Sequence, residues 1–246
     1  MRRNLVLLVL GLFICATTQA QSVDEILDKY YETVGGKKAW KKMSSMKMEG
    51  SAFAQGMDIP VTVYSKAPNK MKVELSINNM TMIPQAFDGE TAWMINPFAG
   101  ATSAQKLPEE QATELKNSVE FEPLYIEHKK KGHEITLEGK EEIDGVSCFK
   151  LKVVKNKNND KDEATEYHFF DAENYVPVMV RSTAKSGPMK GTTSEMFFSD
   201  YQEVGKLMIP HYMEQKVNGQ TFQKITFKTV EVNGKLSDDI FKFPGE

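Results

Sequence analysis

The spacing of hydrophobic residues changes near residue 44. Before this point, apolar positions recur every three or four residues, as on one face of a helix: Val23, Ile26, Leu27, Tyr30 and Val34. Ser22 and Glu25 stand at the spacing of a capping box, and Gly35-Gly36 ends the stripe. The pattern predicts a helix over 22–34 and a short second helix over 37–43.

From Ser44 onward, hydrophobic and polar residues alternate with a period of two, which is typical of strands with one buried face. The predicted strands cover 45–56, 59–66, 70–77, 80–87, 91–96, 133–142, 146–155, 164–171, 176–185, 192–203, 209–217 and 220–233. Turn-forming pairs such as Asp88-Gly89, Asp144-Gly145 and Asn218-Gly219 separate them. Because parallel neighbours need long crossover connections, strands this close in sequence pair antiparallel. The sequence predicts one antiparallel domain of about eleven or twelve strands.

One helical segment interrupts the strands. Pro108 stands at the start of the segment and is followed by Glu109 and Glu110; proline and acidic residues are both favourable in a first helical turn. We predict a helix over 108–118 and a further turn or two of helix over 121–128. Helices placed between runs of strands favour a large curved sheet with a few helices across one face.

The first twenty residues have the pattern of a secretory signal peptide. Arg2 and Arg3 precede an apolar run over 5–14, and small residues stand at 18 and 20, before Gln21. The bulky Phe13-Ile14 pair ahead of Cys15 argues against lipidation of that cysteine. We therefore expect a signal peptide over 1–20, a single domain over 21–246 and a periplasmic location.

Composition and motifs argue against several kinds of chemistry, although a missing motif does not exclude catalysis. The formal charge of −3 provides no overall positive field for a nucleic acid. Cys148 is the one cysteine beyond the predicted signal peptide, and we expect it to be buried. The four histidines form no metal-ligand spacing, and phosphate-binding and nucleophile-elbow motifs are absent from the sequence. We expect no enzyme activity, no metal and no cofactor.

Several strands carry apolar residues on one face throughout. The sequence contains 14 methionines, many of them between residues 43 and 94, and flexible methionine suits surfaces that accept varied apolar shapes. Methionine also fills gaps in a dry core. The residues alone therefore leave two interpretations open, a filled core and an apolar cavity.

Two segments resemble the periplasmic carriers of outer-membrane lipoproteins, the LolA-like family. Residues 65–69 read Ser-Lys-Ala-Pro-Asn, and residues 87–98 read Phe-Asp-Gly-Glu-Thr-Ala-Trp-Met-Ile-Asn-Pro-Phe. The family has a similar Lys-Arg-Pro-Asn turn, followed by Asp-Gly-x-x-x-Trp-x-x-Asn-Pro-Phe. The C-terminal region is similar as well, from Phe198-Ser199-Asp200-Tyr201 through Ile209-Pro210 to Phe241-Lys242-Phe243-Pro244.

This resemblance implies a mainly β fold, a single strongly curved and unclosed antiparallel β-barrel with a helical lid over a hydrophobic cavity. It also implies a periplasmic carrier that binds the acyl chains of lipoproteins or lipids and exchanges cargo with an inner-membrane releasing complex and an outer-membrane acceptor. Nothing in the sequence demands more than a monomer. The candidate cavity residues are Ile59, Val61, Val63, Met71, Val73, Leu75, Met80, Met82, Phe149, Leu151 and Val153. The candidate lid contacts are Trp40, Met43, Leu115 and Leu124.

The sequence departs from the family at the turn over 65–69. The family has an arginine before Pro-Asn that fastens the lid, whereas this chain has Ala67 preceded by Lys66. A lysine cannot reproduce the planar fork of donors of an arginine. Two alternatives therefore stay open: a relative that binds free lipid, and an envelope sensor or interaction protein of the same fold that binds a lipid or protein partner without transporting it.

Overall fold

The computed structural model describes residues 21–121, 123–155, 164–184 and 190–245. The predicted signal peptide lies outside these residues. The helices are α1 (Val23–Thr33), α2 (Lys37–Lys41) and α3 (Glu109–Ser118), with short 3₁₀ turns η1 (Pro97–Ala99) and η2 (Asp238–Ile240). The strands are β1 (Ser45–Ala54), β2 (Met57–Lys66), β3 (Lys70–Ile77), β4 (Met80–Phe87), β5 (Ala92–Asn96), β6 (Ala101–Lys106), β7 (Glu134–Ile143), β8 (Val146–Lys155), β9 (Ala164–Asp171), β10 (Pro177–Thr183), β11 (Thr193–Val204), β12 (Leu207–Val217) and β13 (Gln220–Val232).

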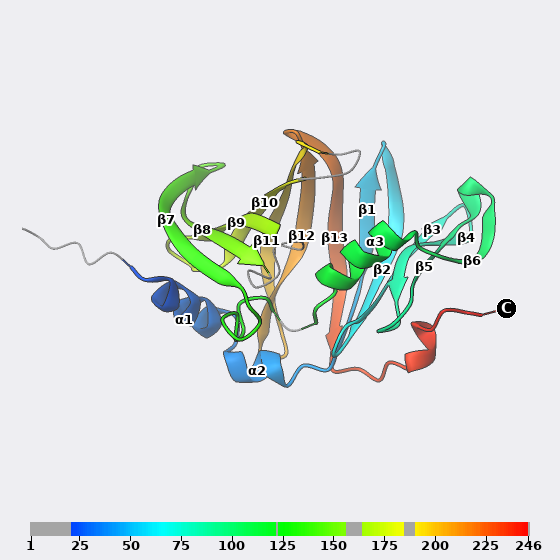
Figure 1. Ribbon diagram of the computed structural model, residues 1–246, viewed down its shortest axis with the longest axis horizontal. Helices are drawn as coiled ribbons and strands as arrows, with labels where there is room; N and C mark the ends of the chain where they lie inside the picture. Colours follow the sequence, from blue (N-terminus) through cyan, green and yellow to red (C-terminus); the bar gives the residue numbers. More distant parts are fainter. Residues whose placement is uncertain (1–20, 122, 156–163, 185–189, 246) are drawn as a thin grey trace, which may run out of the picture.

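All thirteen strands form one antiparallel sheet in the order β6-β5-β4-β3-β2-β1-β13-β12-β11-β10-β9-β8-β7. The N-terminal and C-terminal strand series meet at the β1–β13 pair. Among the described residues, the edge strands β6 and β7 have no strand on their outer sides, so the sheet curves without closing (Figure 1). This confirms the predicted fold class, an unclosed antiparallel half-barrel.

Two features differ from the prediction. Strand β6 was not predicted, because its sequence, ATSAQK, carries small residues where a buried strand carries large ones; β6 pairs with one neighbour, at the edge of the sheet. Residues 124–132 form turns instead of the expected helix over 121–128. Pro123 removes a backbone donor there, and Glu127 has a positive φ of 53°, which a helix does not contain.

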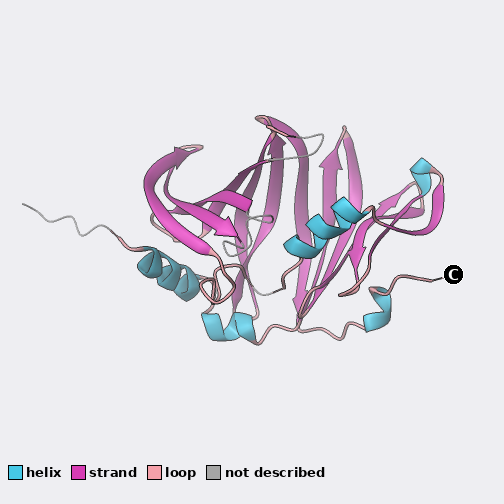
Figure 2. Ribbon diagram, in the orientation of Figure 1, coloured by secondary structure: helices cyan, strands magenta, loops and turns pink. Residues whose placement is uncertain are grey.

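Helix α1 covers the end of the sheet that β7 and β8 form (Figures 1 and 2). Ser22 and Glu25 form the predicted capping box. The buried face of α1, which includes Ile26 and Tyr30, packs on Phe149 and Phe170 of the sheet. This packing fixes the helix by apolar burial, since a helix of this length is marginal alone.

The C-terminal segment is attached to the turns that resemble the carrier family. The indole nitrogen of Trp93 donates to the carbonyl oxygen of Phe241 over 2.8 Å. The Asp88 carboxylate accepts from the backbone nitrogens of Glu90 and Thr91 and, over 3.3 Å, from that of Phe243. These residues of the Asp-Gly-x-x-x-Trp motif therefore hold the end of the chain against β4 and β5.

We predict that Gly35→Ala lowers the free energy of unfolding by about 3 kcal/mol or more. Gly35 joins α1 to α2 with a φ of 102°, and an added Cβ would overlap the carbonyl oxygen of Lys206. Gly36 has a similar φ of 94°, but a Cβ there meets open space. Gly36→Ala therefore carries the backbone strain without the collision. Urea unfolding of Gly35→Ala and Gly36→Ala measures both effects, and equal losses of stability would contradict the close approach of Lys206 to Gly35.

Candidate functional site: the inner face of the half-barrel

The strand register places one set of side chains on the inner face of the sheet. Residues directly opposite each other in neighbouring strands share a face. One such row connects Phe198 with Met213, Ile225, Ala52 and Ile59 across β11, β12, β13, β1 and β2. The inner face is therefore continuous from β11 to β2 and is mainly apolar along this row.

A cavity of about 810 Å³ lies on the inner face, between the sheet and the end of α3 with the chain that follows it. Its volume falls within the range of about 300–1,000 Å³ that is typical of pockets for small ligands. The apolar lining residues are Val119, Pro123, Leu124, Val180, Met196 and Phe198. Glu120 and Lys131 lie on its polar rim and pair with each other over 2.5 Å.

Three lining residues, Lys155, Glu166 and His168, belong to a partly buried polar network. Tyr125 donates its hydroxyl hydrogen to Nδ1 of His168 over 2.6 Å, and Nε2 of His168 donates to Glu166 over 2.9 Å. Glu166 also pairs with Lys155 over 2.6 Å. A neutral His168 imidazole thus accepts at Nδ1 and donates at Nε2, so both ring nitrogens are used. The network therefore attaches the 124–132 turns to strands β8 and β9.

Two ionisable groups of this network, Glu166 and His168, have lowered pKa values. Burial raises the pKa of the Glu166 carboxyl, but the hydrogen bond from His168 and the charge of Lys155 outweigh it and lower the pKa to about 2. Burial lowers the pKa of His168, against the opposing effect of Glu166. Glu166 is therefore ionised and His168 neutral at neutral pH.

The predicted cavity residues of β2 to β4 share the inner face but are not among the residues that line the cavity of about 810 Å³. Val61, Val63, Val73 and Leu75 belong to one apolar cluster, which also includes Phe121 from the chain after α3. The strand pairing then places Ile59, Met80 and Met82 on the same face. Met71 packs beside Leu115 instead, in a separate cluster under α3.

The predicted cavity residues of β8 occupy a filled part of the inner face. Phe149 and Leu151 are buried beneath α1 and contact its apolar side. Val153 is also fully buried. In this structure these three residues are core residues and do not line the cavity. The alternation in their strand is the same for a core and for a cavity, because both bury one face.

The four predicted lid contacts lie at three different places. Leu115 attaches α3 to the sheet by packing on Phe87. Leu124 lines the cavity itself. Trp40 and Met43 close the lower end of the half-barrel, where Trp40 donates its indole hydrogen to the carbonyl oxygen of Val34 over 3.0 Å.

Of the fifteen residues that line the cavity, Leu124 alone was a candidate from the sequence, and the lining residues of strands β10 and β11, Val180, Met196 and Phe198, were not predicted. The sequence contains part of the strand pattern there, because Met196 and Phe198 stand two positions apart, as residues on one face of a strand do. However, Phe197 lies beside them and packs on the outer face with Met179 and Phe169. Apolar residues on both faces of β11 conceal the period of two.

At the turn over 65–69, the Lys66 side chain holds the C-terminal segment, and the backbone holds the chain after α3. Lys66 donates to the carbonyl oxygen of Leu236 over 2.6 Å and pairs with Asp238 over 2.8 Å. The chain after α3 is held at this turn by a backbone bond, from the nitrogen of Phe121 to the carbonyl oxygen of Pro68, over 3.2 Å. A backbone contact thus joins lid and turn at the place where the family has an arginine.

Large apolar side chains are exposed at one edge of the sheet. This edge is formed by strand ends. The turns of the β1–β2, β3–β4 and β12–β13 hairpins all lie there, because neighbouring strands are antiparallel. The exposed fractions are 46% for Phe53, 51% for Met57, 43% for Met80 and 60% for Phe222. This apolar rim lies at the end of the half-barrel opposite α2 (Figure 1).

The described residues contain no group of three metal-ligating side chains close enough to hold an ion. In the same residues, none of the helices combines the length and the apolar character that crossing a bilayer requires. Cys148 is a free, buried thiol, and burial raises its pKa to about 11, so it is protonated at neutral pH. This agrees with the structural role that its sequence position predicts.

Comparisons with known proteins give a likeness in fold. No protein-family model and no curated protein matches the sequence. A DUF1329 family protein from Desulfovibrio piger is 13% identical, with a TM-score of 0.59 over 90% of this chain and 98% of that one. A protein domain from Vibrio parahaemolyticus, described as outer membrane lipoprotein-sorting, is 12% identical, with a TM-score of 0.57 over 88% and 94%. A LolA superfamily protein from Nitrosomonas europaea is 14% identical, with a TM-score of 0.57 over 91% and 98%. The chain therefore has the LolA-like fold that its sequence motifs resemble.

Proposed function

We propose that this protein is a periplasmic carrier that binds the acyl chains of a lipid or lipoprotein against the inner face of its half-barrel. The observation that carries the proposal is the cavity of about 810 Å³ beside a continuous apolar face. Val73, Leu75, Met196 and Phe198 lie on this face, and each keeps part of its surface exposed. The inner face is thus incompletely filled by the protein's own side chains.

The physical benefit of such a cavity is large. Each buried methylene contributes about 0.8 kcal/mol, so a sixteen-carbon chain gains about 12 kcal/mol by leaving water. Transfer between two apolar cavities is nearly neutral in free energy, and release then needs no local energy source. The apolar rim at Phe53, Met57, Met80 and Phe222 is where we place the exchange of cargo, because it adjoins the open end of the inner face.

The location and partners follow from the same proposal. The signal-peptide pattern over 1–20 directs the chain out of the cytoplasm. A carrier there would take cargo from an inner-membrane releasing complex and pass it to an outer-membrane acceptor. The solved structure from Vibrio parahaemolyticus, described as a lipoprotein-sorting domain, supports this role by its shared fold. The proposal involves binding without chemical turnover.

Native mass spectrometry of the exported protein purified from its own cell envelope, followed by lipid extraction, tests the proposal. We expect a bound acylated molecule that organic solvent releases. An acylated peptide identifies a lipoprotein carrier, and a free phospholipid identifies a carrier of lipids. A protein that is empty and also fails to bind added fluorescent fatty acids would overturn the proposal in favour of the interaction-protein alternative.

A further inference from the structure

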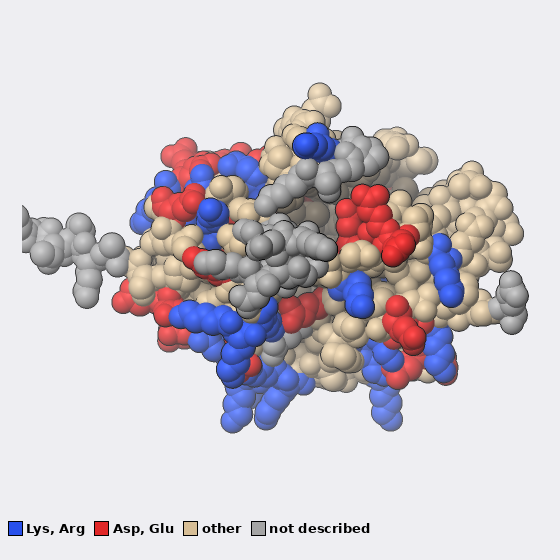
Figure 3. Space-filling view, in the orientation of Figure 1, with Lys and Arg blue, Asp and Glu red and all other residues tan. Residues whose placement is uncertain are grey.

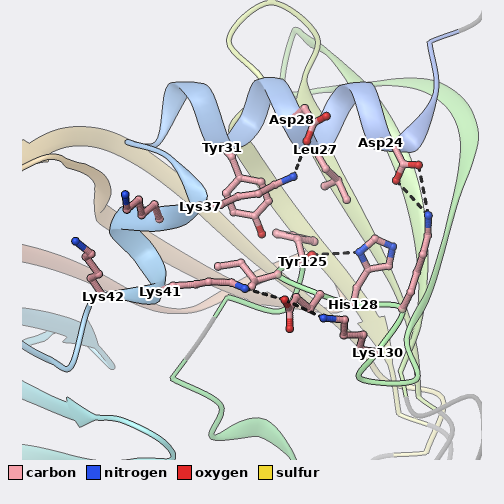
Figure 4. Close-up of a pocket in the computed structure, with 14 residues that line it drawn as sticks. Asp24, Leu27, Asp28, Tyr31, Lys37, Lys41, Lys42, Tyr125, His128 and Lys130 are labelled. Atoms are coloured by element: carbon pink, nitrogen blue, oxygen red, sulfur yellow. Dashed lines mark hydrogen bonds and ion pairs between the residues drawn. The ribbon is translucent and has the colours of Figure 1, made fainter.

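A second cavity, of about 720 Å³, lies outside the half-barrel, between α1, α2 and the 124–132 turns (Figure 4). Its floor is apolar and includes Leu27, Tyr31 and Ile126, which are buried. Its walls carry six lysines from two separate parts of the chain: Lys37, Lys38, Lys41, Lys42, Lys129 and Lys130. We call this feature the basic cleft.

Local sequence explains why the lysines face outward. Residues 37–43 read KKAWKKM, in which Trp40 and Met43 pack into the closed end of the half-barrel. The lysines on either side of Trp40 are therefore left in solvent, where all four are exposed. The 124–132 turns bring Lys129 and Lys130 to the opposite wall, held in place by Tyr125 and its bond to His168. Lys and Arg side chains gather over α2 at the lower edge of Figure 3.

The cleft keeps an excess of positive charge. Three acidic residues line it, and each pairs with lysine: Asp28 with Lys37 over 2.5 Å, Glu127 with Lys41 over 2.8 Å, and Asp24 with Lys129 over 3.4 Å. Lys38 and Lys42 form no ion pair with the residues that the structure describes. The pairs that do form are exposed and therefore weak. This positive surface stands on a chain whose formal charge is −3.

The character of the cleft favours a bilayer over a peptide as its partner. All six basic residues are lysines, which act as mobile point charges, whereas bidentate recognition of a defined carboxylate or phosphate uses arginine. The floor residues Leu27, Tyr31 and Ile126 are nearly fully buried, so each offers little surface to a peptide side chain. A bilayer surface presents many equivalent phosphates, so it needs neither an arginine nor an apolar pocket. Each lysine near that surface adds to the free energy of binding.

We propose that the basic cleft docks the protein on a bilayer containing anionic phospholipids, with lipid phosphates between the lysines of α2 and those of the 124–132 turns. This inference does not rest on the carrier function. The cleft lies at the closed end of the half-barrel, away from the apolar rim, so docking leaves the inner face accessible.

Vesicle co-sedimentation tests the proposal. The full exported protein is mixed with vesicles of phosphatidylcholine alone, or with about a third phosphatidylglycerol, at low and physiological ionic strength. We expect binding to the anionic vesicles alone, and weaker binding at higher salt. Lys38→Ala with Lys42→Ala should weaken the partition about thirtyfold, given the contribution of each lysine near an anionic leaflet. Lys190→Ala with Lys228→Ala is the matched control, because both lysines are exposed, remote from the cleft and change the net charge equally.

Two results would overturn the proposal. Equal losses in the two double variants would assign the attraction to net charge and not to the cleft. Binding to polyglutamate, without binding to anionic vesicles, would identify an acidic protein as the partner. Circular dichroism of each variant verifies folding, and retention of fluorescent fatty acid reports on the inner face separately, so that failure of docking and failure of the carrier function are distinguishable.

Discussion

Val73→Glu is expected to reduce acyl-chain binding by about a hundredfold or more while the protein stays folded. Val73 lies in the middle of β3, opposite Val63 of β2, on the inner face. A carboxylate there keeps its water while the face is open, but loses it when an acyl chain covers the face. The cost of removing that water opposes binding directly. Titration with a fluorescent fatty acid measures the loss.

Ser76→Glu is the matched control for this prediction. Ser76 lies in the same strand on the outer face and is exposed, so the same charge should leave acyl binding unchanged. Met82→Glu repeats the test closer to the open rim, on a side chain that is partly exposed in the structure. Unchanged binding in both inner-face variants, with normal circular dichroism, would remove β3 and β4 from the binding surface.

The sequence predicts the sheet well, because the period of two and the turn pairs are local properties. Twelve of the strands appear within a few residues of their predicted bounds. The pattern does not show whether another element covers a side chain on the inner face of the sheet. Leu151 and Val73 both stand in clean alternations, yet α1 covers Leu151, whereas Val73 faces the partly open side of the sheet.

The polar network of the cavity was equally invisible in the sequence. Tyr125 and His168 are 43 positions apart, and their contact depends on the turns that replace the expected helix over 121–128. The same turns bring Lys129 opposite α2. The basic cleft therefore owes one wall, and the inner-face cavity part of its lining, to a segment whose conformation is set by tertiary contacts and not by local propensity.

We expect the protein to lose stability as pH falls from about 7 toward about 2, first through His168 and then through Glu166. Both groups have a lowered pKa in the folded state. In the unfolded chain the imidazole takes up a proton below its ordinary pKa of 6.5, whereas buried His168 does not, so acid favours unfolding. Glu166 adds the same sign below the ordinary glutamate pKa of 4.5, and its contribution is lost as the pH falls toward about 2.

Urea unfolding at several pH values measures this dependence. His168→Gln should flatten the slope between pH 6.5 and pH 4.5, the ordinary pKa values of the two groups, where a single proton contributes at most about 1.4 kcal/mol per pH unit. Tyr125→Phe should cost about 1–3 kcal/mol at neutral pH, since Nδ1 of buried His168 then lacks its donor. If the Tyr125–His168 hydrogen bond stabilises the fold, the losses of stability in Tyr125→Phe and His168→Gln do not add in the double variant. Additive losses and an unchanged slope would show that His168 is an independent core residue, and apolar packing of Leu124, Tyr125 and Ile126 would then hold the 124–132 turns.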